Sequence, residues 1–223
     1  ALRSRIESGN LVRAKTPGEE RMADVLPAYL ERIRTTVKLA RPMNIAIDCG
    51  NGVAGPTAVA LFRALGCEVV ELFTDIDGTF PNHHPDPAHP ENLQDLIRTL
   101  RDTDAELGLA FDGDGVRLGV VTKGGQIIYP DRQIMLFAQD IVGRNPGADI
   151  VYDVKCSRHL STVISELGGR PIMWKTGHSN IKAKLRAIRL ERSRKRMLAA
   201  VPKATVVITN PTHYSVALRY LPE

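Results

Sequence analysis

Residues 44–73 follow the order strand, glycine-rich turn, helix and strand. The run Asn44–Asp48 is typical of a buried strand, and residues 49–56 hold three glycines and a proline. A helix is predicted over Thr57–Leu65 and a second strand over Glu68–Phe73. This order is one βαβ unit, and it implies two parallel strands joined by a right-handed crossover.

The rest of the chain continues the alternation of helices and strands. Helices are predicted over Val25–Ala40, Glu91–Arg101, Asp131–Ile141 with Asp131 as N-cap, and Ser157–Leu167. Strands are predicted over Leu107–Ala110, Leu118–Val121, Asp149–Val154, Arg170–Trp174 and Thr205–Thr209. We expect an α/β protein with mixed sheets flanked by helices, and functional loops at the carboxyl ends of strands.

Composition narrows the class of protein. The 223 residues are 43% hydrophobic and 25% charged, as in a soluble globular protein, and no apolar run approaches the ~20 residues of a membrane span. We see no secretory-signal pattern. Three widely spaced cysteines, Cys49, Cys67 and Cys156, argue against a disulfide framework or a zinc cluster and favour a reducing, cytoplasmic location. Cys49 and Cys67 are expected in the core.

The basic charge is local. Residues 182–196 hold eight basic side chains and one acidic one, so this segment carries +7 and the remainder of the chain −2. A solvated charged helix is the favoured reading of the segment. A nucleic-acid or anionic-membrane role is a less favoured alternative, and the main body carries no nucleic-acid signature.

The loop Phe111–Arg117 places Asp112 and Asp114 one residue apart between two strands. Two carboxylates on such a loop suit a hard cation, and Arg117 suits a phosphate. The alternative is an ordinary hairpin turn, because Asp-Gly pairs are common turn formers.

Two further strand ends carry cations. Lys155 follows one strand and precedes a helix, where backbone N–H groups favour a phosphate. The run Lys175–Ser179 adds another lysine and His178. Taken singly, each residue is better read as a surface or capping residue. Taken with Asp112 they favour a phosphoryl-transfer site, where positioning and charge neutralisation dominate catalysis.

The loop of residues 80–90 contains His83, His84 and His89 among four prolines. A metal site is not the favoured reading, because the loop lacks cysteines and the helical i,i+4 spacing of zinc motifs.

Five segments together resemble the bacterial phosphomannomutase/phosphoglucomutase branch of the α-D-phosphohexomutases, over about residues 1–182. They are Asp48–Gly55, Phe80–Pro87, Gly108–Gly115, Tyr129–Arg132 and Trp174–Ser179. The resemblance implies an isomerase that moves phosphate between the 1- and 6-positions of mannose or glucose phosphate, with Mg²⁺. It implies Asp112 and Asp114 as metal ligands, with Val116 in place of a third aspartate. It also implies Arg117, Lys155 and His178 as phosphosugar-binding residues.

The same resemblance implies a domain division. Residues 1–24 correspond to the end of domain 1 and a linker, 25–126 to domain 2, and 127–182 to a truncated domain 3. The phosphoserine loop of domain 1, the sugar-reading loop of domain 3 and all of domain 4 are not matched. We therefore expect no catalytic nucleophile in these residues and no activity from this polypeptide alone.

The tail, residues 181–223, resembles the flagellar and type III secretion export switch protein. Asn210, Pro211, Thr212 and His213 match the motif at which that family cleaves its own backbone. This resemblance implies protein secretion as an alternative function, with secretion-apparatus proteins as partners. We expect poor self-cleavage, because the sequence ends before most of the domain that would hold the turn. The meeting of two families near Ile181 is best explained as a chimera.

Overall fold

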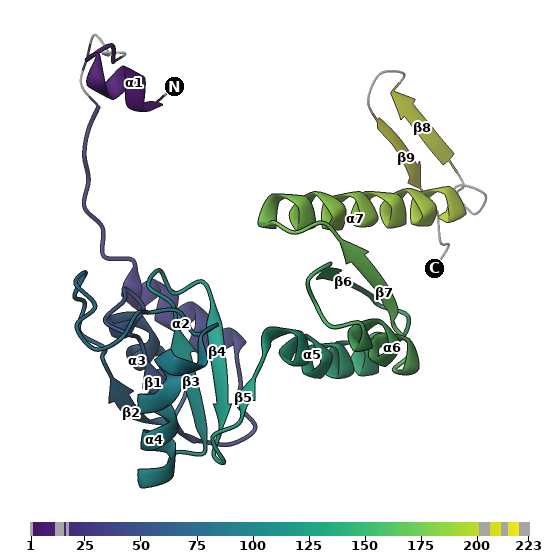
Figure 1. The fold of residues 1–223 in the computed structure, drawn as a ribbon. Coiled ribbons are helices and arrows are strands. Elements are labelled where there is room, and N and C mark those ends of the chain that lie inside the picture. Colours follow the sequence, from purple (N-terminus) through teal and green to yellow (C-terminus); the bar gives the residue numbers. More distant parts are fainter. Residues whose placement is uncertain (1, 12–15, 17, 201–205, 211–213, 219–223) are drawn as a thin grey trace. The chain divides into compact units, whose positions relative to one another are not determined.

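The computed structural model describes residues 2–11, 16, 18–200, 206–210 and 214–218 (Figure 1). The chain divides into two compact units, residues 1–126 and 127–223. The first begins with a short helix, α1 (Leu2–Glu7), which contributes no buried residue.

The first unit is built on a mixed sheet in the order β2-β1-β3-β4-β5, of which only the two-residue β5 falls after residue 126. Its strands are β1 (Asn44–Asp48), β2 (Glu68–Leu72), β3 (Leu107–Phe111), β4 (Leu118–Thr122) and β5 (Ile127–Ile128). Strand β1 pairs in parallel with both β2 and β3, whereas β3 and β4 are antiparallel. The parallel pair predicted from residues 44–73 is therefore confirmed.

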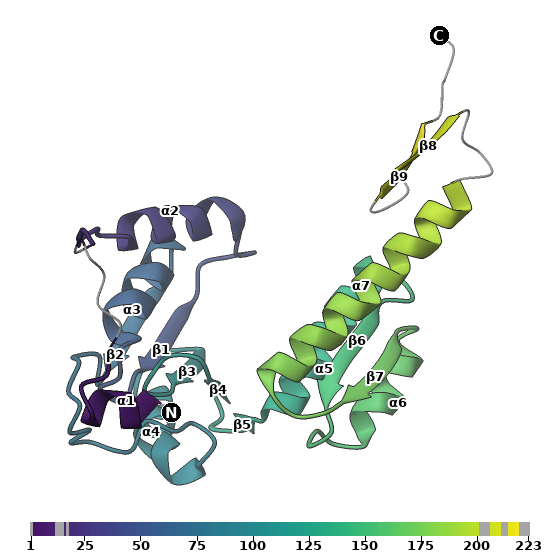
Figure 2. The ribbon, with the colours of Figure 1, turned by 90° about the horizontal axis from the view of Figure 1, so that it is seen from above.

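Helices cover both faces of this sheet. On one face α3 (Gly55–Ala64) places Ala58 in a cluster with Ile47 and Leu109, and α2 (Leu26–Thr36) packs on α3. On the other, α4 (Gln94–Asp102) follows the 3-10 turn η1 (Pro90–Leu93) and packs on β1, β3 and β4 (Figure 2). Leu96 and Leu100 of α4 are fully buried, and a Cβ on Gly108 would lie only 2.8 Å from Leu100 Cδ1.

Most helix boundaries differ from the prediction by a few residues, and two of these differences have a clear local cause. The helix predicted to Ala40 ends at Thr36, where the hydroxyls of Thr35 and Thr36 donate to the Arg32 carbonyl and compete with helix continuation. Helix α5 (Pro130–Arg144) begins with Tyr129 as N-cap, so Asp131 as N-cap was wrong. The fixed φ of Pro130 suits the first helical position and moves the start of the helix upstream.

The second unit is built on a parallel pair, β6 (Asp149–Asp153) and β7 (Arg170–Trp174), joined by α6 (His159–Glu166). Its core holds Ala138 of α5, Tyr152 of β6, and Leu160 and Ile164 of α6. Helix α7 (His178–Ala200) packs on β6 and β7, on the other side of the strands from α5 and α6 (Figure 1).

A hairpin follows α7. Strand β8 (Val206–Asn210) corresponds to the strand predicted at 205–209, and it pairs antiparallel with β9 (Tyr214–Leu218), which was not predicted. The predicted α/β class, with a mixed sheet flanked by helices, is confirmed by the architecture of the first unit.

Candidate functional site

Three loops meet at the carboxyl ends of β1, β2 and β3, because these strands run in parallel and end on the same side of the first sheet. They are residues 49–54 after β1, residues 73–89 after β2 and residues 112–117 after β3. Backbone hydrogen bonds tie them to each other. Val53 N donates to Gly113 O at 3.1 Å, Gly113 N to Pro85 O at 3.2 Å, and Asn51 N to Phe73 O at 2.8 Å.

Glycines, which have no side chain, allow this close approach between the loops. A Cβ on Gly52 would lie 2.8 Å from Gly113 O, and one on Gly50 would lie 2.9 Å from Pro85 Cβ. Gly50 also has φ +50°, in the left-handed region that glycine adopts at low cost. The glycines of the Asp48–Gly55 segment therefore serve backbone packing between the loops.

Asp112 is the buried member of the predicted metal pair, with 5% of its surface exposed. Arg117 holds both of its oxygens: the backbone N donates to Oδ1 at 2.8 Å and Nε donates to Oδ2 at 2.6 Å. Burial raises the pKa of Asp112, but the hydrogen bonds and charge of Arg117 outweigh it and hold the pKa below its usual range. Asp112 is therefore an ionised carboxylate.

Arg117 joins two loops. Besides Asp112, its Nη1 donates to Asp86 Oδ1 at 2.8 Å, so one guanidinium bridges the proline- and histidine-rich loop and the Asp112 loop. The sequence identified Arg117 as a phosphate-binding residue but gave no sign of its pairing with Asp86. The side chain is 55% exposed, so it remains accessible to an anion.

Asp114 is exposed, and its Oδ1 accepts from Val116 N at 3.3 Å. Val116, 63% exposed, supplies no ligand where a third carboxylate was expected. Within the described residues no three His, Cys, Asp or Glu side chains gather as a metal cluster. Two carboxylates nevertheless fit Mg²⁺, which keeps several waters and often uses one or two protein carboxylates.

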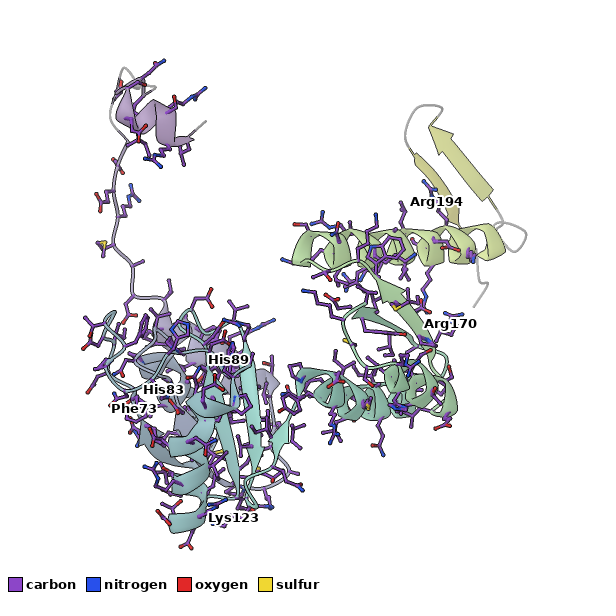
Figure 3. All side chains as sticks on the ribbon, in the orientation of Figure 1. Phe73, His83, His89, Lys123, Arg170 and Arg194 are labelled. Carbon is purple, nitrogen blue, oxygen red and sulfur yellow. The ribbon has the colours of Figure 1, made fainter. Side chains whose placement is uncertain are left out.

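His83 forms a pair that sequence reasoning missed. Its Nε2 lies 3.0 Å from Oδ2 of Asp48, whose side chain is 1% exposed, and its ring meets Phe73 edge-on with centroids 5.4 Å apart (Figure 3). The hydrogen bond to Asp48 is the largest influence on this histidine and raises the pKa of His83 to about 8. The sequence did contain a signal for such a pair. Asp48 ends a buried apolar strand, and a buried carboxylate needs a hydrogen-bonding or charged partner.

The other two predicted loops adjoin each other in the second unit, after β6 and β7. Val154 N donates to Trp174 O at 3.0 Å. Asp153 Oδ1 accepts from both Lys155 N and Thr176 Oγ1 at 2.8 Å, and these bonds lower the pKa of Asp153. The Lys155 side chain is exposed at this edge. Convergence of these loops with Asp112, which lies in the first unit, stays a prediction.

Several predicted residues fall outside what the structure describes. Residue 178 begins α7, but its imidazole lies outside the described side chains. Asn210 ends β8 and Tyr214 begins β9, whereas Pro211, Thr212 and His213 lie outside the described residues. The thiols of Cys49 and Cys67 are free and buried, as expected for core residues. In the described part of the chain, no helix is both long and apolar enough to cross a bilayer.

Three family models match the chain. Residues 27–125 match the phosphoglucomutase/phosphomannomutase alpha/beta/alpha domain II, and residues 129–192 match domain III of the same family. Residues 175–223 match the FlhB HrpN YscU SpaS family. The last two matches overlap over 175–192, within α7 and the loop before it.

Curated relatives agree with these models. The chain is 58% identical over 186 residues to a phosphomannomutase/phosphoglucomutase of Pseudomonas aeruginosa. These residues make up 83% of this chain and 40% of the relative. It is 58% identical over 182 residues to a phosphoglucomutase of Neisseria meningitidis, covering 82% and 40%. The chain thus spans about 40% of the length of these relatives.

Solved phosphoglucomutase and phosphomannomutase structures also resemble the chain. A phosphoglucomutase/phosphomannomutase family protein from Burkholderia thailandensis is 63% identical with a TM-score of 0.77, over 83% of this chain and 40% of that one. A phosphomannomutase-like structure from Thermus thermophilus, at 21% identity and a TM-score of 0.63, shares the fold. Over residues 27–192, matched by domains II and III, the chain belongs to the phosphoglucomutase/phosphomannomutase family.

Proposed function

We propose that this chain is the central part of a phosphohexomutase, an isomerase that moves phosphate between the 1- and 6-positions of mannose or glucose phosphate. The observation that carries the proposal is the match to domains II and III, with 58% identity to a phosphomannomutase/phosphoglucomutase over 186 residues. The ionised Asp112 beside Arg117 supports it, because phosphoryl transfer depends on fixed charges around the phosphate.

In this proposal Asp112 and Asp114 hold Mg²⁺, which would neutralise negative charge on a transferring phosphoryl group when bound. Arg117 keeps Asp112 ionised and fixes its orientation through two hydrogen bonds. Lys155 and His178 bind the phosphosugar from the loops after β6 and β7. The hydrogen bonds that Lys155 N and Thr176 Oγ1 donate to Asp153 set the spacing of these two loops.

We propose that the 223 residues by themselves do not turn over substrate. They span about 40% of the relatives' length, and Val116 replaces one expected metal ligand. A conversion assay from hexose 1-phosphate to hexose 6-phosphate, with added Mg²⁺ and a hexose bisphosphate activator, tests this directly. Turnover above the no-protein background would overturn it.

Binding can survive where turnover does not. Calorimetric titration with glucose 6-phosphate should detect weak binding that falls in Lys155→Gln, because the ammonium at the end of β6 is lost. Lys38→Gln, an exposed lysine of the first unit, is the matched control and should bind as the parent does. Equal affinities in all three proteins would count against the assigned role of Lys155.

The proposed organisation assigns residues 25–126 to domain 2, 127–182 to a truncated domain 3 and 183–223 to an export-switch-like segment. Three free cysteines suit a reducing compartment, and we place the protein in the cytoplasm.

A second candidate function rests on the match of residues 175–223 to the FlhB HrpN YscU SpaS family. The segment would act in protein secretion through contacts with secretion-apparatus proteins. Self-cleavage between Asn210 and Pro211 is its signature reaction, and we expect it to be poor here. Intact-mass spectrometry after incubation, with Asn210→Ala as the non-cleaving control, measures release of residues 211–223. Efficient release from the parent chain alone would refute the expectation.

A further inference from the structure

A charged hollow of about 370 Å³ lies in the second unit, where α7 packs against the amino-terminal ends of β6 and β7. Asp149 and Arg170, the first residues of these strands, line one side. Lys184, Arg192 and Lys195 of α7 line the other. Strand β6 has five residues and rises about 3.3 Å per residue, so Lys155 lies at the opposite end of the strand, roughly 13 Å or more away. The hollow is therefore separate from the proposed phosphosugar loops.

Two arginines converge in this hollow on one carboxylate. Arg170 Nε lies 2.7 Å from Asp149 Oδ1, and Arg192 Nη2 lies 2.6 Å from Asp149 Oδ2. The Asp149 side chain is 12% exposed, and it fixes both guanidinium groups at the rim. Each guanidinium carries five N–H donors, and one carboxylate shared by two arginines accepts only some of them, so both arginines keep donors for a ligand. Such forks suit phosphate oxygens.

Two lysines complete the set. Lys195 pairs with Glu191 at 2.6 Å and stays 73% exposed. Lys184 Nζ lies 4.3 Å from the centre of the Trp174 ring, an attraction between a cation and an aromatic face. Both lysine ammoniums can therefore reorient toward a ligand without breaking a buried pair.

The charges of the lining do not balance. Four cationic side chains face two carboxylates, Asp149 and Glu191, which gives a net charge of +2 around one concave surface. Like charges gathered in a hollow repel each other, and a bound anion relieves that repulsion. Ile172 and Ile188 add an apolar floor. A volume near 370 Å³ lies within the usual range for small-molecule sites.

We propose that this hollow binds a small phosphate-bearing anion through Arg170, Arg192, Lys184 and Lys195. The site combines strand residues matched by domain III with α7 residues, of which Lys195 lies beyond the domain III match. It is independent of the proposed mutase function. Arg194 lies on the same helix outside the lining, which shows that the hollow takes only part of the basic surface of α7 (Figure 3).

Trp174 is the single tryptophan of the chain, and Lys184 of the hollow contacts its ring, so binding that moves Lys184 should change the intrinsic fluorescence. Trp174 itself ends β7 and does not line the hollow, so the variants below assign the signal to the hollow or to the neighbouring loop. Titration of the full chain with pyrophosphate should give a saturable fluorescence change. The double variant Arg170→Gln/Lys195→Gln should bind at least about tenfold more weakly, because two of the four cations are lost. Calorimetry on the same samples provides the affinity independently of the tryptophan signal.

The matched control is Lys182→Gln/Arg186→Gln, which removes two exposed charges of α7 outside the hollow. Its affinity should stay within about twofold of the parent chain. Equal weakening in the two double variants would mean general attraction to a basic helix and would overturn the proposal. So would the absence of saturable binding by both methods up to about 10 mM pyrophosphate. Circular dichroism melts confirm that each variant is folded before titration.

Discussion

His83 Nε2 lies 3.0 Å from Oδ2 of Asp48, so a histidine of the loop after β2 neutralises the carboxylate that ends β1. Asp48 also accepts from Gly50 N at 2.9 Å. The pair fixes the proline- and histidine-rich loop at the carboxyl ends of the strands. There Asp86 of the loop accepts from Arg117, and the Pro85 carbonyl accepts from Gly113 N. A protonated His83 is thus part of the scaffold of the candidate metal loop.

The first prediction is that the first unit loses stability as the pH rises. The pKa of His83 is raised to about 8 in the folded protein, whereas the unfolded value is near 6.5. The stabilisation is therefore complete below about pH 6.5 and disappears as the pH passes 8. It amounts to about 2 kcal/mol. Urea unfolding followed between pH 6 and 9 measures it.

Substitution tests whether His83 is the group whose titration causes this pH dependence. His83→Gln should remove most of the pH dependence, and His84→Gln, whose ring meets Phe80 and not Asp48, should retain it. Asp48 and Asp95 are the acidic groups that influence His83, so a slope unchanged in His83→Gln would assign the titration elsewhere.

The second prediction concerns Gly55 at the start of α3. A Cβ at this position would lie 1.9 Å from the carbonyl oxygen of Thr74, which belongs to the backbone and cannot rotate away. Gly55→Ala should destabilise the first unit by about 3 kcal/mol or more. Gly78→Ala is the control, since nothing lies within 4 Å of its added Cβ. Thermal melts of the two variants that coincide would contradict the packing argument.

The third prediction concerns the metal loop. Val116→Asp adds a carboxylate two residues from Asp114, and Mg²⁺ affinity should tighten roughly tenfold because the charge of the ligand set increases. Val154→Asp places the same change on another exposed valine, in the second unit, and should leave affinity unaltered. Calorimetric Mg²⁺ titration distinguishes them. An equal gain in both variants would mean a general effect of net charge.

The fourth prediction concerns Arg117. Arg117→Gln deprives Asp112, 5% exposed, of its cationic partner and should cost about 1–3 kcal/mol of unfolding free energy. Arg98→Gln removes an exposed pair with Asp95 on α4 and should cost less than about 0.5 kcal/mol. Urea unfolding at pH 7 compares the two. A cost for Arg117→Gln no larger than that for Arg98→Gln would show that Asp112 does not depend on the guanidinium.

Local patterns predicted most of the elements but few of the long-range contacts. The βαβ order over 44–73 and the loop between Leu107–Ala110 and Leu118–Val121 depend on short-range periodicity and on glycine, so both were found. The Asp48–His83 pair joins residues 35 positions apart and needs the tertiary fold. For the same reason the sequence suggested Arg117 as a phosphate ligand but could not indicate its partner Asp86.

The position of β1 between β2 and β3 has a consequence for the order of events during synthesis. Ile45 pairs with Leu107, so one edge of β1 has no strand to pair with until residues more than sixty positions later have been made. At about 5–20 residues per second, this interval lasts about 3–12 s. The helix α3 and strand β2 can join β1 early, because they follow it directly. The nascent chain therefore exposes one apolar strand edge for seconds, and during that interval the edge is open to pairing with another chain.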